Sequence, residues 1–282
     1  MTDNRKRGED ALAQLDRELK SRDRAEKSRP LKIGAAAAVV ILAIVAGIWF
    51  LATRDTEGEI TAEDESTATT TEAPEMEPLT MARAEALPAT VTCEYPEGGD
   101  ASREVSTPAT DDISTEGTAT VTLTTNQGPI GMELDRSVAP CTVNVIEHLA
   151  SEGYYDDTVC HRLTTSGIHV LQCGDPSGSG AGGPGFQFAN EYPTDELDGP
   201  ASSPVIYPRG SIAMANAGPD TNGSQFFLNY DDSPLAPDYT YFGQISAEGL
   251  ETLDAIAAAG AEGGAADGAP AEEVRIETAD VE

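Results

Sequence analysis

The side chains best suited to chemistry lie in three short stretches of the C-terminal half. They are His161-Arg162, the run VLQCGD over 170–175, and the run MANAGPDTNGSQFF over 214–227. Arg162 has a permanent positive charge and several N–H donors on a rigid fork, so it suits donation to an atom that becomes an acceptor during a reaction. For Arg162 taken alone, the alternative is a surface ion pair with one of the many carboxylates.

Other sequence patterns do not support a phosphate-binding, hydrolase or zinc site. The Gly-rich run over 175–186 has no lysine and does not open a helix, so a phosphate cradle is not predicted. No G-x-S-x-G elbow is present, which argues against that class of hydrolase. Asn222-Gly223-Ser224 fits a glycosylation sequon, a pattern common by chance. Three His and four Cys leave little material for a zinc cluster, so no such cluster is expected.

Short strands are predicted to position these stretches. Residues 119–125 and 129–135 predict a hairpin around a turn at 126–128. Helices are predicted from Pro140 to Gly153 and over 249–259. Further strands are predicted within 158–164, 169–175, 210–217, 224–230, 240–245 and 274–279. The fold class is therefore mainly β, compatible with a closed β-barrel capped by two helices.

Charge divides the chain into two regions. Residues 1–32 hold ten basic and seven acidic residues, a balance of +3, whereas residues 53–282 hold seven arginines and 42 acidic residues, a balance of −35. The acidic excess argues against nucleic-acid binding. Between these regions, Ile33–Ala52 is an uncharged apolar run of twenty residues. At about 1.5 Å per residue it spans about 30 Å, the thickness of a bilayer core.

This run predicts a single transmembrane helix that acts as an uncleaved signal anchor. The excess of Lys and Arg before it makes residues 1–32 a cytoplasmic tail, so the remainder is expected outside the cytoplasmic membrane. A cleaved signal peptide and a buried core helix are the alternatives.

The segment after the membrane run is predicted to be a spacer. Residues 53–92 are rich in Thr, Glu, Ala and Pro without a sustained apolar period, which predicts a disordered acidic stalk. Residues 93–115 form a turn-rich lead-in segment. All four cysteines (Cys93, Cys141, Cys160 and Cys173) lie beyond the membrane run, so two disulfides are expected, with three possible pairings. Free buried thiols are the alternative.

The motifs HR…Q-x-G-D and MANAGPDTNGSQFF resemble those of the cyclophilins, which are peptidyl-prolyl cis/trans isomerases. The resemblance covers residues 116–282 and implies an eight-stranded barrel closed by two helices, with no cofactor. With its N-terminal anchor, the chain looks like the membrane-bound cyclophilins of actinobacteria.

The resemblance also implies residue roles. Arg162 matches the catalytic arginine, and Gln172 matches the glutamine that positions it. The residues implied to hold the substrate backbone are Ala215, Asn216 and Gln225. Those implied to wall the proline pocket are Val170, Phe227 and Leu235.

Three positions depart from the common eukaryotic pattern. His169 stands where a pocket phenylalanine is usual, Pro234 stands where many members have the tryptophan that favours cyclosporin, and Tyr239 stands where a histidine lines the pocket. Weak cyclosporin binding is therefore expected.

The chemistry is physically reasonable for these residues. The planar X-Pro amide has a rotation barrier near ~20 kcal/mol, and twisting it makes the prolyl nitrogen a lone-pair acceptor. A donor aimed at that nitrogen binds the twisted state better than either planar state. Removing about 7 kcal/mol of barrier gives roughly 10⁵-fold acceleration. The expected substrates are proline-containing segments of exported or cell-envelope proteins.

Two other functions remain open from the sequence. One is a non-catalytic cyclophilin-like module that binds proline-containing segments. The other is a structural spacer in which the acidic stalk matters most. For the disulfides, Cys160 and Cys173 flank the ends of the predicted HR…Q hairpin, which favours the pairs Cys160–Cys173 and Cys93–Cys141.

Overall fold

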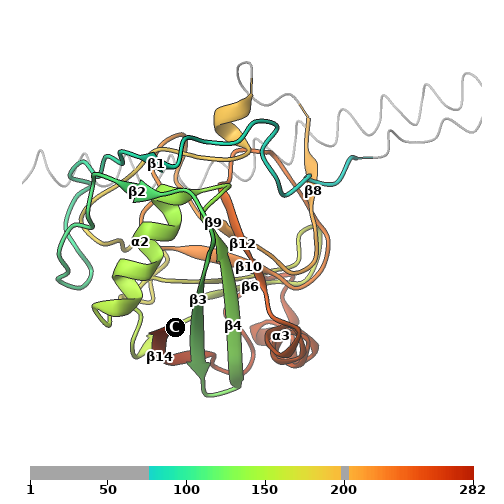
Figure 1. Cartoon of the computed structure of the whole chain (residues 1–282). Coiled ribbons are helices and arrows are strands. Elements are labelled where there is room, and N and C mark those ends of the chain that lie inside the picture. Colours follow the sequence, from blue (N-terminus) through green and yellow to red (C-terminus); the bar gives the residue numbers. More distant parts are fainter. Residues whose placement is uncertain (1–75, 198–202) are drawn as a thin grey trace, which may run out of the picture. The chain divides into compact units, whose positions relative to one another are not determined.

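The computed structural model describes residues 76–197 and 203–282 (Figure 1). The predicted cytoplasmic tail (1–32), the predicted transmembrane helix (33–52) and the first part of the predicted stalk (53–75) lie outside the described residues. Within the described part, no helix is both long and apolar enough to cross a bilayer.

Short strands and two helices make up the described chain. The strands are β1 (Thr90–Val91), β2 (Ile113–Ser114), β3 (Thr118–Thr125), β4 (Gly128–Asp135), β5 (Thr158–Val159), β6 (Arg162–Thr164), β7 (Val170–Cys173), β8 (Val205–Tyr207), β9 (Ser211–Met214), β10 (Phe226–Asn229), β11 (Ser233–Leu235), β12 (Tyr241–Ile245), β13 (Asp267–Gly268) and β14 (Arg275–Val281). The α-helices are α2 (Pro140–Ser151) and α3 (Ala247–Ala259), with single 3₁₀ turns η1 (Thr194–Glu196) and η2 (Glu262–Gly264). The predicted mainly β fold with two helices is confirmed.

One antiparallel sheet carries the fold. Its ten strands follow the order β13-β6-β7-β10-β9-β12-β4-β3-β14-β5, and two small sheets, β1-β2 and β11-β8, accompany it. Only Cys160 and His161 separate β5, at one end of this order, from β6, near the other end. Because two residues span only about 7 Å, the sheet must curl until its two ends approach each other.

This pairing differs from the predicted eight-stranded closed barrel. The order has ten strands and includes the two-residue strands β5 and β13. Strand β5 lies within the predicted strand segment 158–164, whereas β13 comes from the low-complexity loop, where no strand was predicted. Among the described residues, no recorded pair joins β13 to β5.

The β3–β4 hairpin follows the predicted alternation. Its register runs from Thr118↔Asp135 to Thr125↔Gly128 around Asn126 and Gln127. Val121, Leu123 and Ile130 point to one face and are fully buried, as expected for a sheet with one face on the core.

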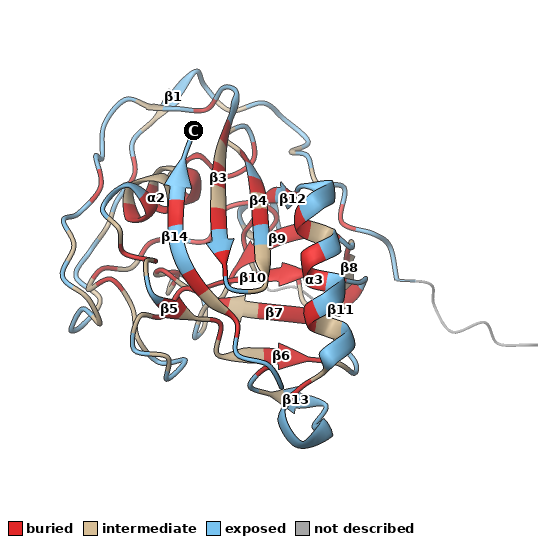
Figure 2. Ribbon diagram, turned by 90° about the horizontal axis from the view of Figure 1, so that it is seen from below, coloured by how far each residue is buried: buried red, intermediate tan, exposed pale blue. Residues whose placement is uncertain are grey.

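Both helices pack one apolar stripe on the sheet and expose the other side, as Figure 2 shows for α3. Helix α2 begins at Pro140, as predicted, and its buried Val143, Ile146 and Leu149 recur at helical spacing. Helix α3 begins at Ala247, two residues before the predicted start, because the Ser246 hydroxyl accepts the Gly249 amide at 3.0 Å. That bond is a side-chain N-cap.

The core lies inside the curled sheet. Large, fully buried side chains come from the sheet, from α2 and from the turn after it, among them Tyr154, Tyr155, Phe226, Phe242, Leu123, Ile130, Leu134 and Ile146. Tyr155 meets Phe226 and Tyr154 edge to face, with ring centroids 5.6 Å apart in each pair. Aromatic pairs favour this arrangement.

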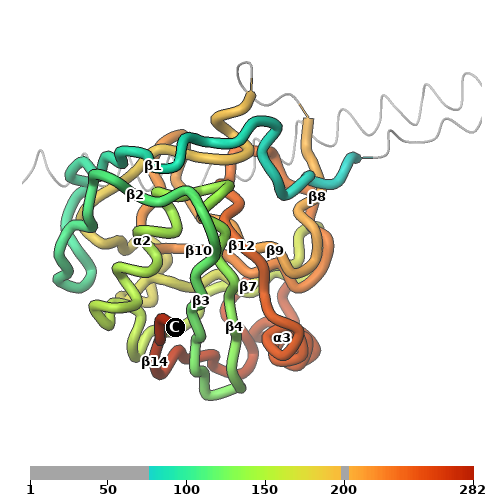
Figure 3. The backbone as a smooth tube through the Cα atoms, in the orientation of Figure 1, coloured from blue at the N-terminus to red at the C-terminus, as the bar shows by residue number. Residues whose placement is uncertain are grey.

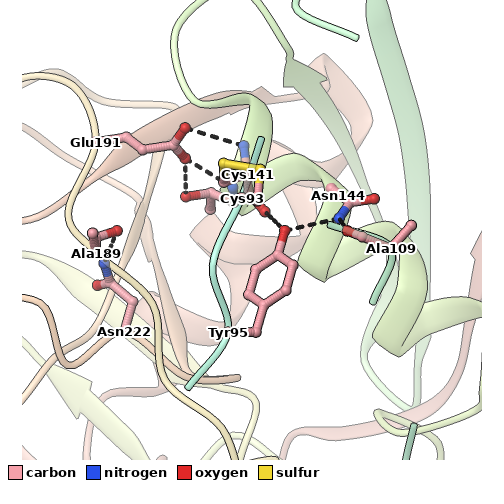
Figure 4. Close-up of a disulfide and its surroundings, with 9 residues drawn as sticks. Cys93, Tyr95, Ala109, Cys141, Asn144, Ala189, Glu191 and Asn222 are labelled. Atoms are coloured by element: carbon pink, nitrogen blue, oxygen red, sulfur yellow. Dashed lines mark hydrogen bonds between the residues drawn. A yellow bond between two sulfur atoms is a disulfide. The ribbon is translucent and has the colours of Figure 1, made fainter. Parts of the chain in front are cut away.

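The disulfides are Cys93–Cys141 and Cys160–Cys173, so the favoured pairing is confirmed. The first joins the lead-in segment to α2 (Figure 4). Beside it, Tyr95 donates to the Cys141 carbonyl at 3.2 Å and accepts from Asn144 at 2.8 Å. Glu191 accepts the Cys141 amide at 3.0 Å, which places a carboxylate at the N-terminus of α2.

The lead-in segment continues past α2, as the tube in Figure 3 shows. Its residues 93–103, here called the strap, then pair with the Gly-rich loop, residues 175–186. Gly98 donates to the Gly185 carbonyl at 2.9 Å, and Ser102 donates to the Gly183 carbonyl at 2.8 Å.

The prediction of a disordered stalk is wrong for residues 76–92. Pro78 bridges to Ile206, and Leu79 is 7 % exposed. The Arg83 side chain, also 7 % exposed, pairs with Asp195 at 2.6 Å. These few packed residues lie in a segment that is otherwise mostly polar. The average composition of the segment therefore does not reveal that part of it packs on the domain.

Candidate active site

Cross-strand register gathers the predicted site residues on one face of the sheet. Arg162 of β6 lies opposite Gln172 of β7, and Gln172 lies opposite Phe227 of β10. Phe227 in turn lies opposite Ala213 of β9. Residues directly opposite each other in a sheet point to the same side. These neighbouring strands can be followed in Figure 2.

A chain of side-chain hydrogen bonds runs along this row. Arg162 Nη1 donates to Gln172 Oε1 at 3.2 Å, and Gln172 Nε2 donates to Gln225 Oε1 at 2.9 Å. Gln225 Nε2 then donates to the carbonyls of Gly180 at 3.1 Å and Gly182 at 2.9 Å. The Gly-rich loop therefore supports the orientation of Arg162 through two glutamines.

Asp175 organises that loop from inside. Its side chain is fully buried and accepts the amides of Ser177 at 2.8 Å, Gly180 at 2.8 Å and Gly182 at 3.0 Å. Burial by itself would raise the pKa of Asp175, but the bonds from Ser177 and from the Gly182, Ser177 and Gly180 amides outweigh burial and lower the pKa to about 2. A Cβ on Gly182 would collide with this carboxylate, so the loop requires glycine there.

A cavity of about 160 Å³ opens beside Arg162. Its lining residues are Arg162, Ile168, Val170, Gln172, Ala215, Asn216, Phe227, Leu235 and Tyr239. The floor is aromatic, since Phe227 meets Tyr239 edge to face at 5.5 Å. A cavity that combines apolar and aromatic lining residues with one cationic side chain can hold a small ring and present N–H donors to it.

Eight of the ten predicted site residues line this cavity, and His169 and Gln225 do not. The His169 ring packs edge to face on Tyr230 at 5.7 Å instead. Side chains alternate along a strand, so Ile168, Val170 and Gln172 share the cavity face while His169 points to the other. The placement of His169 in the pocket wall is therefore corrected to Ile168.

Gln225 lines a second, adjoining cavity of about 340 Å³. Gln172, Ala215 and Asn216 border both cavities, so the two form one continuous groove. The Gly-rich loop walls the larger cavity, and Gly98 and Asp100 of the strap complete it.

The positive charge at the site belongs to Arg162 and not to the neighbouring His161. Burial lowers the pKa of His161, and both ring nitrogens lack a hydrogen-bond partner among the described residues. The imidazole is therefore neutral near pH 7. Arg162 keeps its charge, because a bidentate bond to Asp267 raises the pKa of the guanidinium.

The contact between Arg162 and Asp267 was not predicted from the sequence. Asp267 lies in a Gly- and Ala-rich loop 105 residues after Arg162 and gives no local signal. Ile168 could have been predicted, because side chains alternate along a strand and Ile168 lies two residues before Val170. Asp175 with Ser177 and Ser179 also follows a known pattern, in which a side chain bonds the backbone two residues on.

Comparison with known proteins identifies the family of the chain. A family model described as cyclophilin type peptidyl-prolyl cis-trans isomerase/CLD matches residues 120–281. The chain belongs to the cyclophilin family. The strap lies before the matched residues.

Several curated proteins resemble this cyclophilin. It is 55 % identical over 190 residues to the probable peptidyl-prolyl cis-trans isomerase B of Mycobacterium tuberculosis, covering 65 % of this chain and 62 % of that protein. It is 52 % identical over 194 residues to the protein of the same name in Mycobacterium leprae, covering 67 % and 66 %. The chain thus spans just under two thirds of these relatives' length.

Two further matches have lower sequence identity. A peptidyl-prolyl cis-trans isomerase of Helicobacter pylori is 45 % identical over 141 residues, which is 49 % of this chain and 80 % of that protein. A solved cyclophilin-type isomerase of Cryptosporidium parvum gives a TM-score of 0.49 at 32 % identity, covering 59 % of this chain and 98 % of that one.

Proposed function

We propose that this cyclophilin is a peptidyl-prolyl cis/trans isomerase that acts on proline-containing segments of exported or cell-envelope proteins. One observation carries the proposal, namely the position of Arg162 at the wall of a cavity of about 160 Å³ lined mainly by apolar residues. The cavity receives the proline ring, and Arg162 donates to the prolyl nitrogen as the amide twists. Family membership supports the activity, since the relatives are named for it.

The chemistry needs differential binding only. In the planar amide the nitrogen lone pair is delocalised and is a poor acceptor. In the twisted amide that lone pair is localised, so a charged donor stabilises the transition state more than either planar state. The apolar residues around the cavity lower the local dielectric constant, which strengthens this interaction. No covalent bond forms or breaks.

The location is part of the proposal. The apolar run Ile33–Ala52 would hold the chain in the cytoplasmic membrane as a signal anchor, with the isomerase domain outside. Two disulfides support an oxidising compartment on that side.

The test is isomerisation of a short X-Pro peptide by residues 76–282 and by the Arg162→Ala variant. We expect rapid catalysis by the unchanged fragment and a loss of about a hundredfold or more in the variant, the usual effect of removing one transition-state donor. If both proceed at the uncatalysed rate while circular dichroism shows folded protein, the activity is excluded and a proline-binding module remains.

Cyclosporin provides a second check on the pocket. Pro234 pairs with Ile206 in the small β8–β11 sheet, and Tyr239 rather than histidine lines the cavity. We expect weak inhibition of peptide isomerisation by cyclosporin. An inhibition constant in the nanomolar range would contradict this expectation.

A further inference from the structure

The Arg162 guanidinium has a second partner besides Gln172. Its Nε donates to Asp267 Oδ1 at 2.8 Å, and its Nη2 donates to Asp267 Oδ2 at 2.7 Å. This is the parallel bidentate arrangement that fixes both the position and the plane of a guanidinium. Gln172 alone supplies one bond at 3.2 Å, about which the group could still rotate.

Backbone hydrogen bonds fix the loop that carries Asp267 beside β6. Strand β13 pairs with β6, with Asp267 opposite Thr164, and Thr165 donates to the Ala266 carbonyl at 2.8 Å. The loop also closes on itself, since Glu262 donates to the Ala269 carbonyl at 2.8 Å and Ala271 donates to the Gly260 carbonyl at 2.8 Å. The low-complexity run thus presents the carboxylate from a backbone-bonded hairpin.

Arg162 keeps free N–H groups after bonding to Asp267 and Gln172. A guanidinium has five N–H donors, one on Nε and two on each terminal nitrogen. Asp267 takes one on Nε and one on Nη2, and Gln172 takes one on Nη1. One proton therefore remains on each terminal nitrogen. Asp267 does not line the cavity, so its carboxylate holds Arg162 from outside the space that a proline ring would occupy.

We propose that Asp267 is a positioning residue for isomerisation, which fixes the Arg162 guanidinium so that its two remaining protons stay available to the prolyl nitrogen. The role rests on the proposed function. A flexible arginine in a strongly acidic protein has many other carboxylates to visit, and each such excursion withdraws the donor from the cavity. Holding the donor in place before the reaction lowers the cost of reaching the transition state.

The chain contains a matched control pair. Arg209 donates to Asp254 through Nη1 at 2.8 Å and Nη2 at 2.9 Å, so it is also bidentate. Side-chain exposures are 38 % and 55 % in this pair, against 39 % and 55 % for Arg162 and Asp267. Neither Arg209 nor Asp254 lines the groove. Any general effect of losing an exposed ion pair should appear equally in both.

The experiment measures kcat and KM for one X-Pro peptide with the full-length chain in detergent. The variants are Asp267→Ala, Asp267→Asn, Asp267→Glu and the control Asp254→Ala. We expect kcat to fall about tenfold in Asp267→Ala with KM within about twofold, because the interaction acts in the transition state. Asp267→Asn should behave similarly, Asp267→Glu should recover part of kcat, and Asp254→Ala should leave both constants unchanged.

Each other outcome overturns the role. An unchanged kcat in folded Asp267→Ala or Asp267→Asn excludes it, and so does an equal loss in Asp254→Ala. A change confined to KM would assign Asp267 to substrate binding instead. An inactive wild-type chain would refute the proposed function itself, and this inference with it. An active wild-type chain whose kcat is matched by Asp267→Ala and Asp267→Asn would refute the inference alone.

Discussion

At the scale of single residues, the site depends on polar groups whose hydrogen bonds extend away from the cavity. Arg162 is oriented by Gln172 and Asp267, Gln172 by Gln225, and Gln225 by carbonyls of the Gly-rich loop. Asp175 stands at the far end of this chain of contacts. Both of its oxygens accept hydrogen bonds from backbone amides. An asparagine in its place would therefore set an N–H donor against one of these amide donors.

The Asp175→Asn variant should be less stable by roughly 1–3 kcal/mol, the cost of an unsatisfied buried donor. The pKa of Asp175 in the folded protein is about 2, below the ordinary value of 3.8. Its contribution is therefore complete above the unfolded value and is lost as pH falls from about 4 to about 2. Urea unfolding at pH 7 and between pH 4 and pH 2 measures both effects. A variant as stable as wild type at pH 7 would contradict this assignment.

At the scale of elements, the two disulfides have different tasks. Cys160–Cys173 joins the segment just before β6 to the last residue of β7, and these two strands carry Arg162 and Gln172. Cys93–Cys141 joins the strap to α2, and the strap lines only the larger cavity. Stability and catalysis should therefore respond separately to the loss of each bond.

Replacing Cys93 and Cys141 together by serine should lower the free energy of unfolding by about 4 kcal/mol, the chain-entropy value for a bond that closes 48 residues. Catalysis on a short X-Pro peptide should persist at a temperature where the variant is folded.

Replacing Cys160 and Cys173 together by serine should lower the free energy of unfolding by about 3 kcal/mol, the chain-entropy value for a bond between residues 13 apart. This variant should also have a lower kcat. Denaturant titration and peptide isomerisation test both, and equal kinetic losses would refute the division.

At the scale of the whole molecule, the electrostatic field is negative. No lysine follows Lys32, and residues 53–282 have a balance of −35. The arginines of the described residues are all bonded to carboxylates or backbone carbonyls, as with Arg83, Arg103 and Arg136. Such a field attracts cationic chains and repels anionic ones over about one Debye length.

For a pair of X-Pro peptides that differ only in flanking Lys or Glu, kcat/KM should therefore depend on salt in opposite directions. Raising the salt from 0.01 M to 1 M shortens the Debye length from about 30 Å to about 3 Å. The rate constant for the Lys peptide should fall several-fold and that for the Glu peptide should rise. Identical salt profiles would show that the net charge does not act on substrates.

The sequence by itself determined the family, the mainly β class, both helices, the β3–β4 hairpin and eight of the residues that line the cavity. These follow from local periodicity and from motifs that are contiguous in the chain. Only the tertiary structure decided that residues 76–92 pack on the domain and that Asp267 holds Arg162. The reason is physical. Each of these depends on strand register or on contacts between residues far apart in the chain, and the free energy of such contacts has no local signature in the sequence.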